Sequence, residues 1–303
     1  MNMETKLCGI KLKNPTVLAS GILGTSKSLL ARVIGNGAGA VTIKSISFEA
    51  REGHKNPTVI AFEGGMMNAV GYSNFGVAGA LKEFVNLNEL EAPIFASVIG
   101  TEAEDFVKVV EGLKGLDFAA IEIPLSCPHT PGFGTLAGQD TPEKTFEITK
   151  AVVKKTKKPV FIKLSPNTKN IGEVAKAAEK AGASAITAVN TMGPGMVINI
   201  EAKKPVLDFK VGGVSGPALK PVAVRCVYDV YESVKIPIIG AGGVLTGKDA
   251  VEMMMAGATA VGIGSGIYYR GIDIFREVCS EISEWVEKNG YKNLKELVGV
   301  AHE

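Results

Sequence analysis

Three kinds of residue in this 303-residue chain could do chemistry: one cysteine in a long polar stretch, lysines at the ends of apolar runs, and clustered glycines. Cys127 lies in Ser-Cys-Pro-His, and a glycine-rich segment follows it. A cysteine can act as a general base where its thiolate is stabilised, and a glycine-rich loop can close over a site and exclude water. A single cysteine is also often a small buried hydrophobic residue, so both roles stay open.

Two lysines follow apolar runs. Lys44 ends the stretch Thr-Ile-Lys, and Lys163 ends Phe-Ile-Lys. A lysine at the end of a strand can direct its ammonium group toward a bound anion and stabilise it. The alternative is a lysine whose aliphatic part covers apolar surface while its charge stays in water.

Glycines cluster near the carboxyl end of the chain, at 240–243 and 262–266, with a third glycine loop at 211–216. Backbone N–H groups of such loops and of helix N-termini can bind phosphate, because no side chain blocks the approach. Ordinary turns would give similar clusters. Two of them after neighbouring strands near the end of the chain favour a phosphate site, without distinguishing FMN from a sugar phosphate.

Asparagines in two predicted loops suit recognition of a heterocycle. Asn68 and Asn190 each offer a hydrogen-bond donor and an acceptor, which match an amide or imide group. Asparagine is also common in turns, because it tolerates a left-handed backbone.

Eight short apolar runs, mostly continuous rather than alternating, predict strands covered on both faces. They lie at 16–20, 40–44, 94–98, 118–123, 159–163, 185–189, 236–240 and 260–263. Amphipathic segments between them, several ending at glycine, predict helices that lead into the next strand. The pattern predicts an α/β fold, a (β/α)8 TIM barrel. An open doubly wound sheet is the alternative, but its glycine fingerprint would follow the first strand.

Two connections are too long for simple turns, at 45–93 and 124–141, so we expect long insertions after strands 2 and 4. Barrel enzymes place their chemistry in such insertions at the carboxyl ends of strands. No linker interrupts the pattern, and we expect a single domain over 1–303.

Composition excludes several classes of protein. The net charge is +2, from 33 basic and 31 acidic residues without a basic tract, so we expect no nucleic-acid partner. No secretory signal and no run of about 18 apolar residues is present, so we expect no membrane span and a cytoplasmic protein. The four cysteines form no C-x-x-C pair, and we expect no metal site.

Taken together, the motifs resemble those of the dihydroorotate dehydrogenase family. The matching stretches, in family order over nearly the whole chain, are L-A-S-G, T-I-K-S, N-A-V-G-Y-S-N, S-C-P, F-I-K-L-S-P-N, V-N-T, G-G-V-S-G-P-A-L-K-P, G-A-G-G-V and G-I-G-S-G. The cysteine resembles the soluble class, since the membrane-bound quinone class has serine there. The glycine loop and the length are most similar to the catalytic subunit of the NAD-dependent two-subunit type, class 1B.

The resemblance implies bound FMN and oxidation of (S)-dihydroorotate to orotate in pyrimidine biosynthesis. Cys127 matches the catalytic base, which takes a proton from C5 while a hydride leaves C6 for the flavin. Flavin contacts are implied at Ser20, Lys44, Ser45, Lys163, Val189, Gly216, Gly242, Gly243, Gly264 and Ser265. Substrate contacts are implied at Lys44, Asn68, Ala69, Val70, Gly71, Tyr72, Asn190 and Thr191.

The catalytic stretch departs from the family's usual E-x-N-x-S-C-P-N, because Pro124 and His129 replace asparagines. Ser97 stands where a flavin-contacting asparagine is common. The run C-P-H, followed by glycines and G-Q-D, also resembles the pyrimidine-reducing domain of dihydropyrimidine dehydrogenase, which acts on uracil or thymine. A flavin- or phosphate-binding barrel without this chemistry is a further alternative.

Electrons must leave the flavin, yet the chain has no early G-x-G-x-x-G for NAD and no cysteine cluster. The resemblance implies a partner, an electron-transfer subunit with FAD and a [2Fe–2S] cluster that reduces NAD. It also implies a homodimer of this chain at the centre of a heterotetramer. The competing hypothesis is a one-subunit enzyme that uses fumarate.

Overall fold

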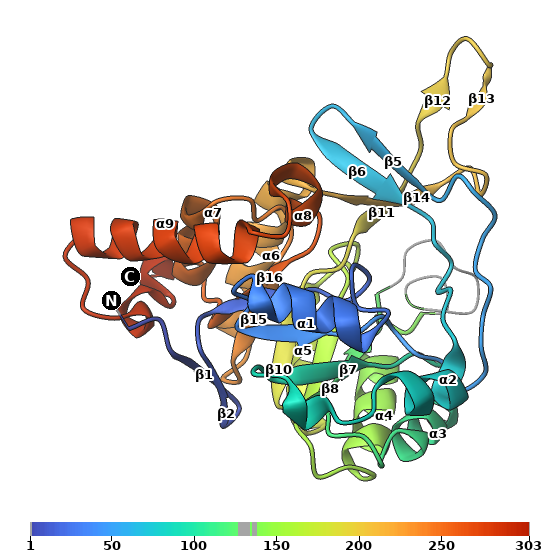
Figure 1. Ribbon diagram of the computed structural model, residues 1–303, viewed down its shortest axis with the longest axis horizontal. Helices are drawn as coiled ribbons and strands as arrows, with labels where there is room; N and C mark the ends of the chain where they lie inside the picture. Colours follow the sequence, from blue (N-terminus) through green and yellow to red (C-terminus); the bar gives the residue numbers. More distant parts are fainter. Residues whose placement is uncertain (1, 127–133, 135–137, 303) are drawn as a thin grey trace.

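A computed structural model describes residues 2–126, 134 and 138–302. Eight parallel strands close into a barrel in the spatial order β10-β15-β16-β3-β4-β7-β8-β9 (Figure 1). The barrel strands are β3 (Thr16–Leu18), β4 (Ala40–Thr42), β7 (Ile94–Ser97), β8 (Ala120–Pro124), β9 (Val160–Leu164), β10 (Ala185–Ala188), β15 (Ile238–Ala241) and β16 (Ala260–Ile263). Each overlaps one of the eight predicted strands, and the (β/α)8 barrel is confirmed.

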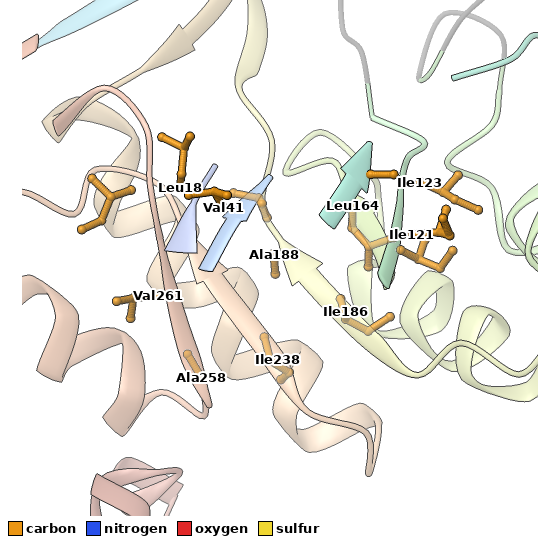
Figure 2. Close-up of a cluster of buried hydrophobic side chains, with 14 of the residues drawn as sticks. Leu18, Val41, Ile121, Ile123, Leu164, Ile186, Ala188, Ile238, Ala258 and Val261 are labelled. Carbon is orange, nitrogen blue, oxygen red and sulfur yellow. The ribbon is translucent and has the colours of Figure 1, made fainter. Parts of the chain in front are cut away.

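Apolar side chains on both faces explain why the strands are continuous apolar runs. On β8, Ile121 and Ile123 point outward and pack beneath the helices, while Ala120 points into the barrel. Figure 2 shows the outer layer, with Leu18 and Ile186 among the side chains between strands and helices. A strand buried on both faces has no position where a polar side chain reaches water.

Helices alternate with the strands as local signals require. They are α1 (Lys27–Gly35), α2 (Gly76–Glu83), α3 (Ala103–Gly112), α4 (Pro142–Val153), α5 (Ile171–Lys180), α6 (Lys220–Ser233), α7 (Gly247–Met255), α8 (Gly266–Arg270) and α9 (Ile274–Lys288). Glycines follow α1, α5 and α7, where Gly37, Gly182 and Gly257 have φ of +105°, +101° and +122°. Only glycine adopts such angles readily, so these residues end each helix and start the next strand. No helix in the described ranges is long and apolar enough to span a bilayer.

A short hairpin closes the amino-terminal end of the barrel. Strands β1 (Thr5–Leu7) and β2 (Ile10–Leu12) pair antiparallel and bury Leu7 and Leu12 completely. These leucines belong to the same cluster as Phe95 and Phe161, whose rings meet edge to face at 5.1 Å inside the barrel. The amino-terminal end is therefore filled by side chains, which leaves the carboxyl-terminal end for a site.

Insertions build a second sheet beyond that carboxyl-terminal end. The connection after β4 contains β5 (Val59–Phe62) and β6 (Gly65–Asn68), together with α2. The connection after β10 contains β11 (Met192–Gly195), β12 (Ile198–Asn199), β13 (Lys204–Pro205) and β14 (Gly212–Ser215). Four of these strands pair in the order β11-β14-β6-β5, and the β12–β13 hairpin extends away from the barrel (Figure 1).

The insertion after β10, residues 189–219, was not predicted. Its strands are two to four residues long and contain glycine and proline, so they carry neither a continuous apolar run nor a clear alternation. The insertion after strand 2 is present as expected. Most of the connection after β8 lies outside the described residues.

Candidate active site

A cavity of about 320 Å³ opens at the carboxyl-terminal end of the barrel. Its wall is formed by residues at or beyond the ends of β3, β4, β8, β9, β10, β15 and β16, and by part of the second sheet. Barrel enzymes bind their ligands at this end, and the volume falls in the range of small-molecule sites.

Most of the predicted site residues lie on this one wall. Those that line the cavity are Ser20, Lys44, Ser45, Asn68, Val70, Gly71, Tyr72, Lys163, Val189, Asn190, Thr191, Gly242, Gly243, Gly264 and Ser265. Two predicted contacts do not line it. Ala69 is completely buried, and Gly216 packs with its carbonyl group behind Gly243. Cys127 and His129 lie outside the described residues.

The two lysines make the cavity electropositive. Lys163, on β9, is only 5 % exposed, and its Nζ donates a hydrogen bond to Ser20 Oγ at 3.1 Å. Lys44 follows β4 on the same wall, and no Asp or Glu belongs to the described lining. An ammonium group held at a buried site favours an anionic ligand, because the surrounding protein screens it less than water would. Burial excludes the solvent-exposed alternative for Lys163.

The glycine clusters place backbone that no side chain covers at the cavity wall. Gly242 and Gly243 have φ of +136° and +75°, and a Cβ on Gly243 would lie 2.7 Å from Lys220 Cβ. The N–H groups of Gly243, Gly264 and Ser265 donate to no described backbone carbonyl. Such unpaired N–H groups beside a cavity form a cradle that suits a phosphate.

An ion pair supports this cradle from behind. Lys220 Nζ lies 2.7 Å from Asp249 Oδ1, and Asp249 Oδ2 accepts hydrogen bonds from the N–H groups of Leu245 and Thr246 at 3.0 and 2.8 Å. Burial by itself would raise the pKa of Asp249, but the hydrogen bonds from Lys220 and the two backbone groups outweigh it and lower the pKa. The loop between Gly243 and α7 is thereby fixed to α6.

Asn190 connects the cavity to the start of the predicted catalytic stretch. Its Nδ2 donates to Ser126 Oγ at 2.9 Å, and its Oδ1 accepts from Thr191 N at 2.8 Å. Ser126 is fully buried and immediately precedes Cys127 in the chain. Asn190 is therefore a positioning contact for that stretch as well as part of the cavity wall.

Pro124 lies on the cavity wall and disturbs no strand pairing. Ile121 N donates to Pro159 O at 2.9 Å and Leu125 N donates to Lys163 O at 3.1 Å, so alternate residues of β8 face β9. The ring nitrogen of Pro124 consequently faces β7, which has already ended at Ser97. Proline is tolerated where no ladder hydrogen bond is lost. It presents an apolar surface to the ligand and no amide.

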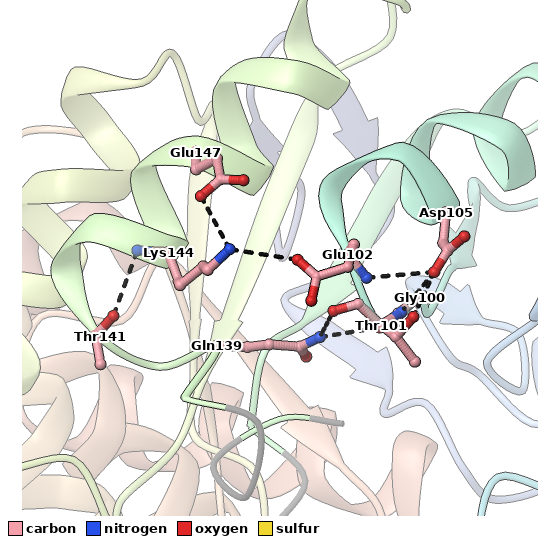
Figure 3. Close-up of polar contacts among 8 residues, drawn as sticks. All are labelled: Gly100, Thr101, Glu102, Asp105, Gln139, Thr141, Lys144 and Glu147. Atoms are coloured by element: carbon pink, nitrogen blue, oxygen red, sulfur yellow. Dashed lines mark hydrogen bonds and ion pairs between the residues drawn. The ribbon is translucent and has the colours of Figure 1, made fainter. Parts of the chain in front are cut away.

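Gln139 fixes the far end of the same connection (Figure 3). Its Nε2 donates to the carbonyls of Gly100 and Thr101 at 3.0 and 2.8 Å, and its Oε1 accepts from Gly134 N at 2.7 Å. Gln139 is 2 % exposed, and both polar atoms of its side-chain amide are hydrogen-bonded. Ion pairs of Lys144 with Glu102 and Glu147 lie beside it at the surface.

Sequence reasoning found Asn68 on the second sheet but missed other residues of that sheet that line the cavity, including Val59, Met66 and Ser215. One signal was available. Two residues, Glu63 and Gly64, separate the apolar runs of β5 and β6, and Gly64 has a φ of +83°. A two-residue turn with glycine between such runs predicts a hairpin.

Burial disfavours the thiolate form of the cysteines in the described chain. Cys8, Cys226 and Cys279 are free thiols, and burial raises the pKa of each to about 11. No group of three potential metal-binding side chains occurs in residues 2–126, 134 and 138–302. None of these three thiols lines the cavity.

Comparison with known proteins agrees with this geometry. A family model described as dihydroorotate dehydrogenase matches residues 2–286. The chain belongs to the dihydroorotate dehydrogenase family. The family expected from the motifs is therefore confirmed, and the match includes the barrel and both insertions that build the second sheet.

This dihydroorotate dehydrogenase family member has full-length relatives named dihydroorotate dehydrogenase B (NAD(+)), catalytic subunit. One, from Methanocaldococcus jannaschii, is 46% identical, with 99% of this chain and 98% of that protein aligned. Another, from Methanothermobacter thermautotrophicus, is 45% identical, with 99% of each covered. A third, from Pyrococcus abyssi, is 44% identical, again with 99% of each covered.

Proposed function

We propose that this chain is the catalytic subunit of a two-subunit dihydroorotate dehydrogenase, which oxidises (S)-dihydroorotate to orotate in pyrimidine biosynthesis. One observation carries the proposal: a single cavity combines two lysines, a glycine cradle and two asparagines, and its described wall holds no acid. This combination suits an anionic cofactor beside an anionic, amide-bearing substrate.

FMN fits the residues that are present. The N–H groups of Gly243, Gly264 and Ser265 would hold its phosphate, and Gly242 keeps that backbone free of side chains. The remaining flavin contacts would be Ser20, Lys44, Ser45, Lys163, Val189 and Gly216, the last through the backbone behind the cradle. When bound, FMN supplies the acceptor for a hydride. The buried ammonium group of Lys163 would stabilise the negative charge that this acceptor gains.

Dihydroorotate carries a carboxylate and an imide-containing ring. Lys44 would bind the carboxylate, and Asn68 and Asn190 would hydrogen-bond the ring, with Val70 to Tyr72 and Thr191 around them. Cys127 would remove the proton from C5, and none of the three cysteines in the described residues lines the cavity. Ala69 is buried, so it would contribute by packing and would hold Asn68 and Val70 in place on the wall.

We further propose that 1–303 forms one FMN-binding domain and that two copies pair at the centre of a heterotetramer. The printed names of the relatives contain the words catalytic subunit, which supports a separate partner. That partner would carry FAD and a [2Fe–2S] cluster and pass electrons to NAD. The free thiols of the described chain fit a reducing, cytoplasmic setting.

The test is anaerobic mixing of the purified yellow protein with dihydroorotate while the flavin absorbance is recorded. Rapid bleaching, reversed by the partner with NAD, is expected. Faster bleaching by dihydrouracil would transfer the activity to dihydropyrimidines, and efficient turnover with fumarate would indicate a one-subunit enzyme. Flavin that stays oxidised with every substrate, or a protein that cannot be loaded with FMN, would contradict the proposal.

A further inference from the structure

His54 lies behind residues 68–72, called here the substrate loop, and is not part of the cavity wall. Its ring Nδ1 lies 3.0 Å from the carbonyl oxygen of Ala69, and its backbone N–H donates to the carbonyl of Val70 at 3.1 Å. A carbonyl oxygen only accepts hydrogen bonds, so Nδ1 carries the proton. One residue therefore holds two consecutive peptide groups of the loop.

The ring also contacts the next residue of the loop. A Cβ on Gly71 would lie 2.7 Å from Cγ and Cδ2 of His54, and Gly71 has a φ of +72°. The imidazole consequently occupies the space that any larger residue at Gly71 would need. His54 thus contacts three consecutive residues of the loop, Ala69 to Gly71.

The same ring joins the loop to the insertion after β10. His54 stacks on Phe209 with ring centroids 3.8 Å apart and planes 6° apart. Phe209 belongs to the insertion 189–219, which also carries Asn190 and Thr191 on the cavity wall. His54 is therefore a physical connection between the two chain segments that carry the proposed substrate contacts.

We propose that His54 is a positioning residue for substrate recognition. It holds the substrate loop from the side away from the cavity, so that Asn68 and Val70 to Tyr72 keep the shape that the ligand needs. This inference rests on the proposed function of that loop. Because His54 lies apart from the glycine cradle and from Lys163, its loss should weaken substrate binding and leave the FMN content unchanged.

The experiment compares holoenzyme variants by the Kd of orotate, followed through the flavin spectrum, and by KM and kcat for dihydroorotate. Removing the hydrogen bond and the stacking in His54→Ala should raise Kd and KM about tenfold, while kcat changes less than about twofold. His54→Asn keeps a donor near the position of Nδ1 and should recover part of the affinity. Phe209→Leu keeps the donor, loses the stacking, and should have an intermediate effect.

His302 offers a matched control. It stacks on Tyr228 at 3.6 Å, and its Nε2 lies 3.1 Å from the carbonyl oxygen of Ala256, far along the chain from the substrate loop. His302→Ala should lower the melting temperature and leave Kd unchanged.

Two results would overturn this inference and leave the proposed function standing. In the first, wild type and His54→Ala bind orotate with equal Kd. In the second, His54→Ala loses FMN together with its affinity for orotate. A wild type that retains FMN and binds no orotate would overturn the proposed function, and this inference with it.

Discussion

Lys163 and Ser20 meet across the mouth of the barrel, with Lys163 Nζ donating to Ser20 Oγ at 3.1 Å. Lys163 is inside β9, and Ser20 lies two residues after the end of β3. The two residues are 143 positions apart in the chain. The hydrogen bond fixes the ammonium group of a nearly buried lysine at the cavity wall. A charge fixed in advance stabilises developing negative charge without reorganisation.

Replacing this charge should slow the reaction. We expect Lys163→Met to slow flavin reduction by dihydroorotate about a hundredfold, the usual scale for one lost electrostatic contact to a developing charge. Stopped-flow measurement at saturating substrate tests this. Ser20→Ala keeps the charge and removes only its anchor, so its effect should be smaller. A Lys163→Met enzyme as fast as wild type would exclude Lys163 from the chemistry.

Cys127→Ser should slow flavin reduction by about 10²–10⁴-fold while FMN stays bound, because a serine hydroxyl is far harder to ionise than a thiol. Cys279→Ser is the control, since burial raises the pKa of the Cys279 thiol to about 11 and keeps it protonated. The single-turnover rates of the two variants give the comparison. Equal rates in Cys127→Ser and wild type would assign Cys127 to packing.

Gln139→Leu should destabilise the protein, because it leaves the buried Gly100 carbonyl, the buried Gly134 N–H and the part-buried Thr101 carbonyl without this partner. Each such group costs about 1–3 kcal/mol, so a clear fall in melting temperature is expected. Activity should fall further than stability explains, since Ser126 and Gly134 bracket the stretch that contains Cys127. Thr141→Ala, which removes only the N-cap of α4, is the control and should cost about 1 kcal/mol. Identical unfolding curves for Gln139→Leu and wild type would contradict this role.

Asp249 should make stability depend on pH in the acid range. Its pKa is lower in the folded protein than in the unfolded chain, so its carboxylate stabilises the fold above the unfolded value of about 3.9. That contribution is lost as the pH falls through the folded value. We expect Asp249→Asn to be less stable than wild type at pH 7, with a smaller difference at pH 2.5.

Denaturant unfolding at both pH values measures the Asp249 effect. Asp229→Asn is a suitable comparison, since Asp229 pairs with an exposed arginine, Arg225, and should matter less. A stability difference for Asp249→Asn that stays constant across the pH range would show that the carboxylate charge is not the cause.

Local sequence by itself determined the barrel strands and the ends of their helices. A continuous apolar run such as 260–263 is typical of a strand covered on both faces, and Gly182 or Gly257 ends a helix through its own backbone angle. Lysines and glycines at the ends of those runs were predicted to share a site, because parallel strands in a closed barrel place their carboxyl ends together.

Tertiary structure alone decided how the insertions complete the site. Strand β14 pairs with β6, so that Gly213 lies opposite Asn68, and His54 stacks on Phe209. These partners are about 145 and 155 residues apart, and their segments are short and rich in glycine. Nothing in their local composition specifies which segment pairs with which. The choice depends on packing over the barrel mouth, since register and stacking are set by contacts that exist only once the barrel has closed.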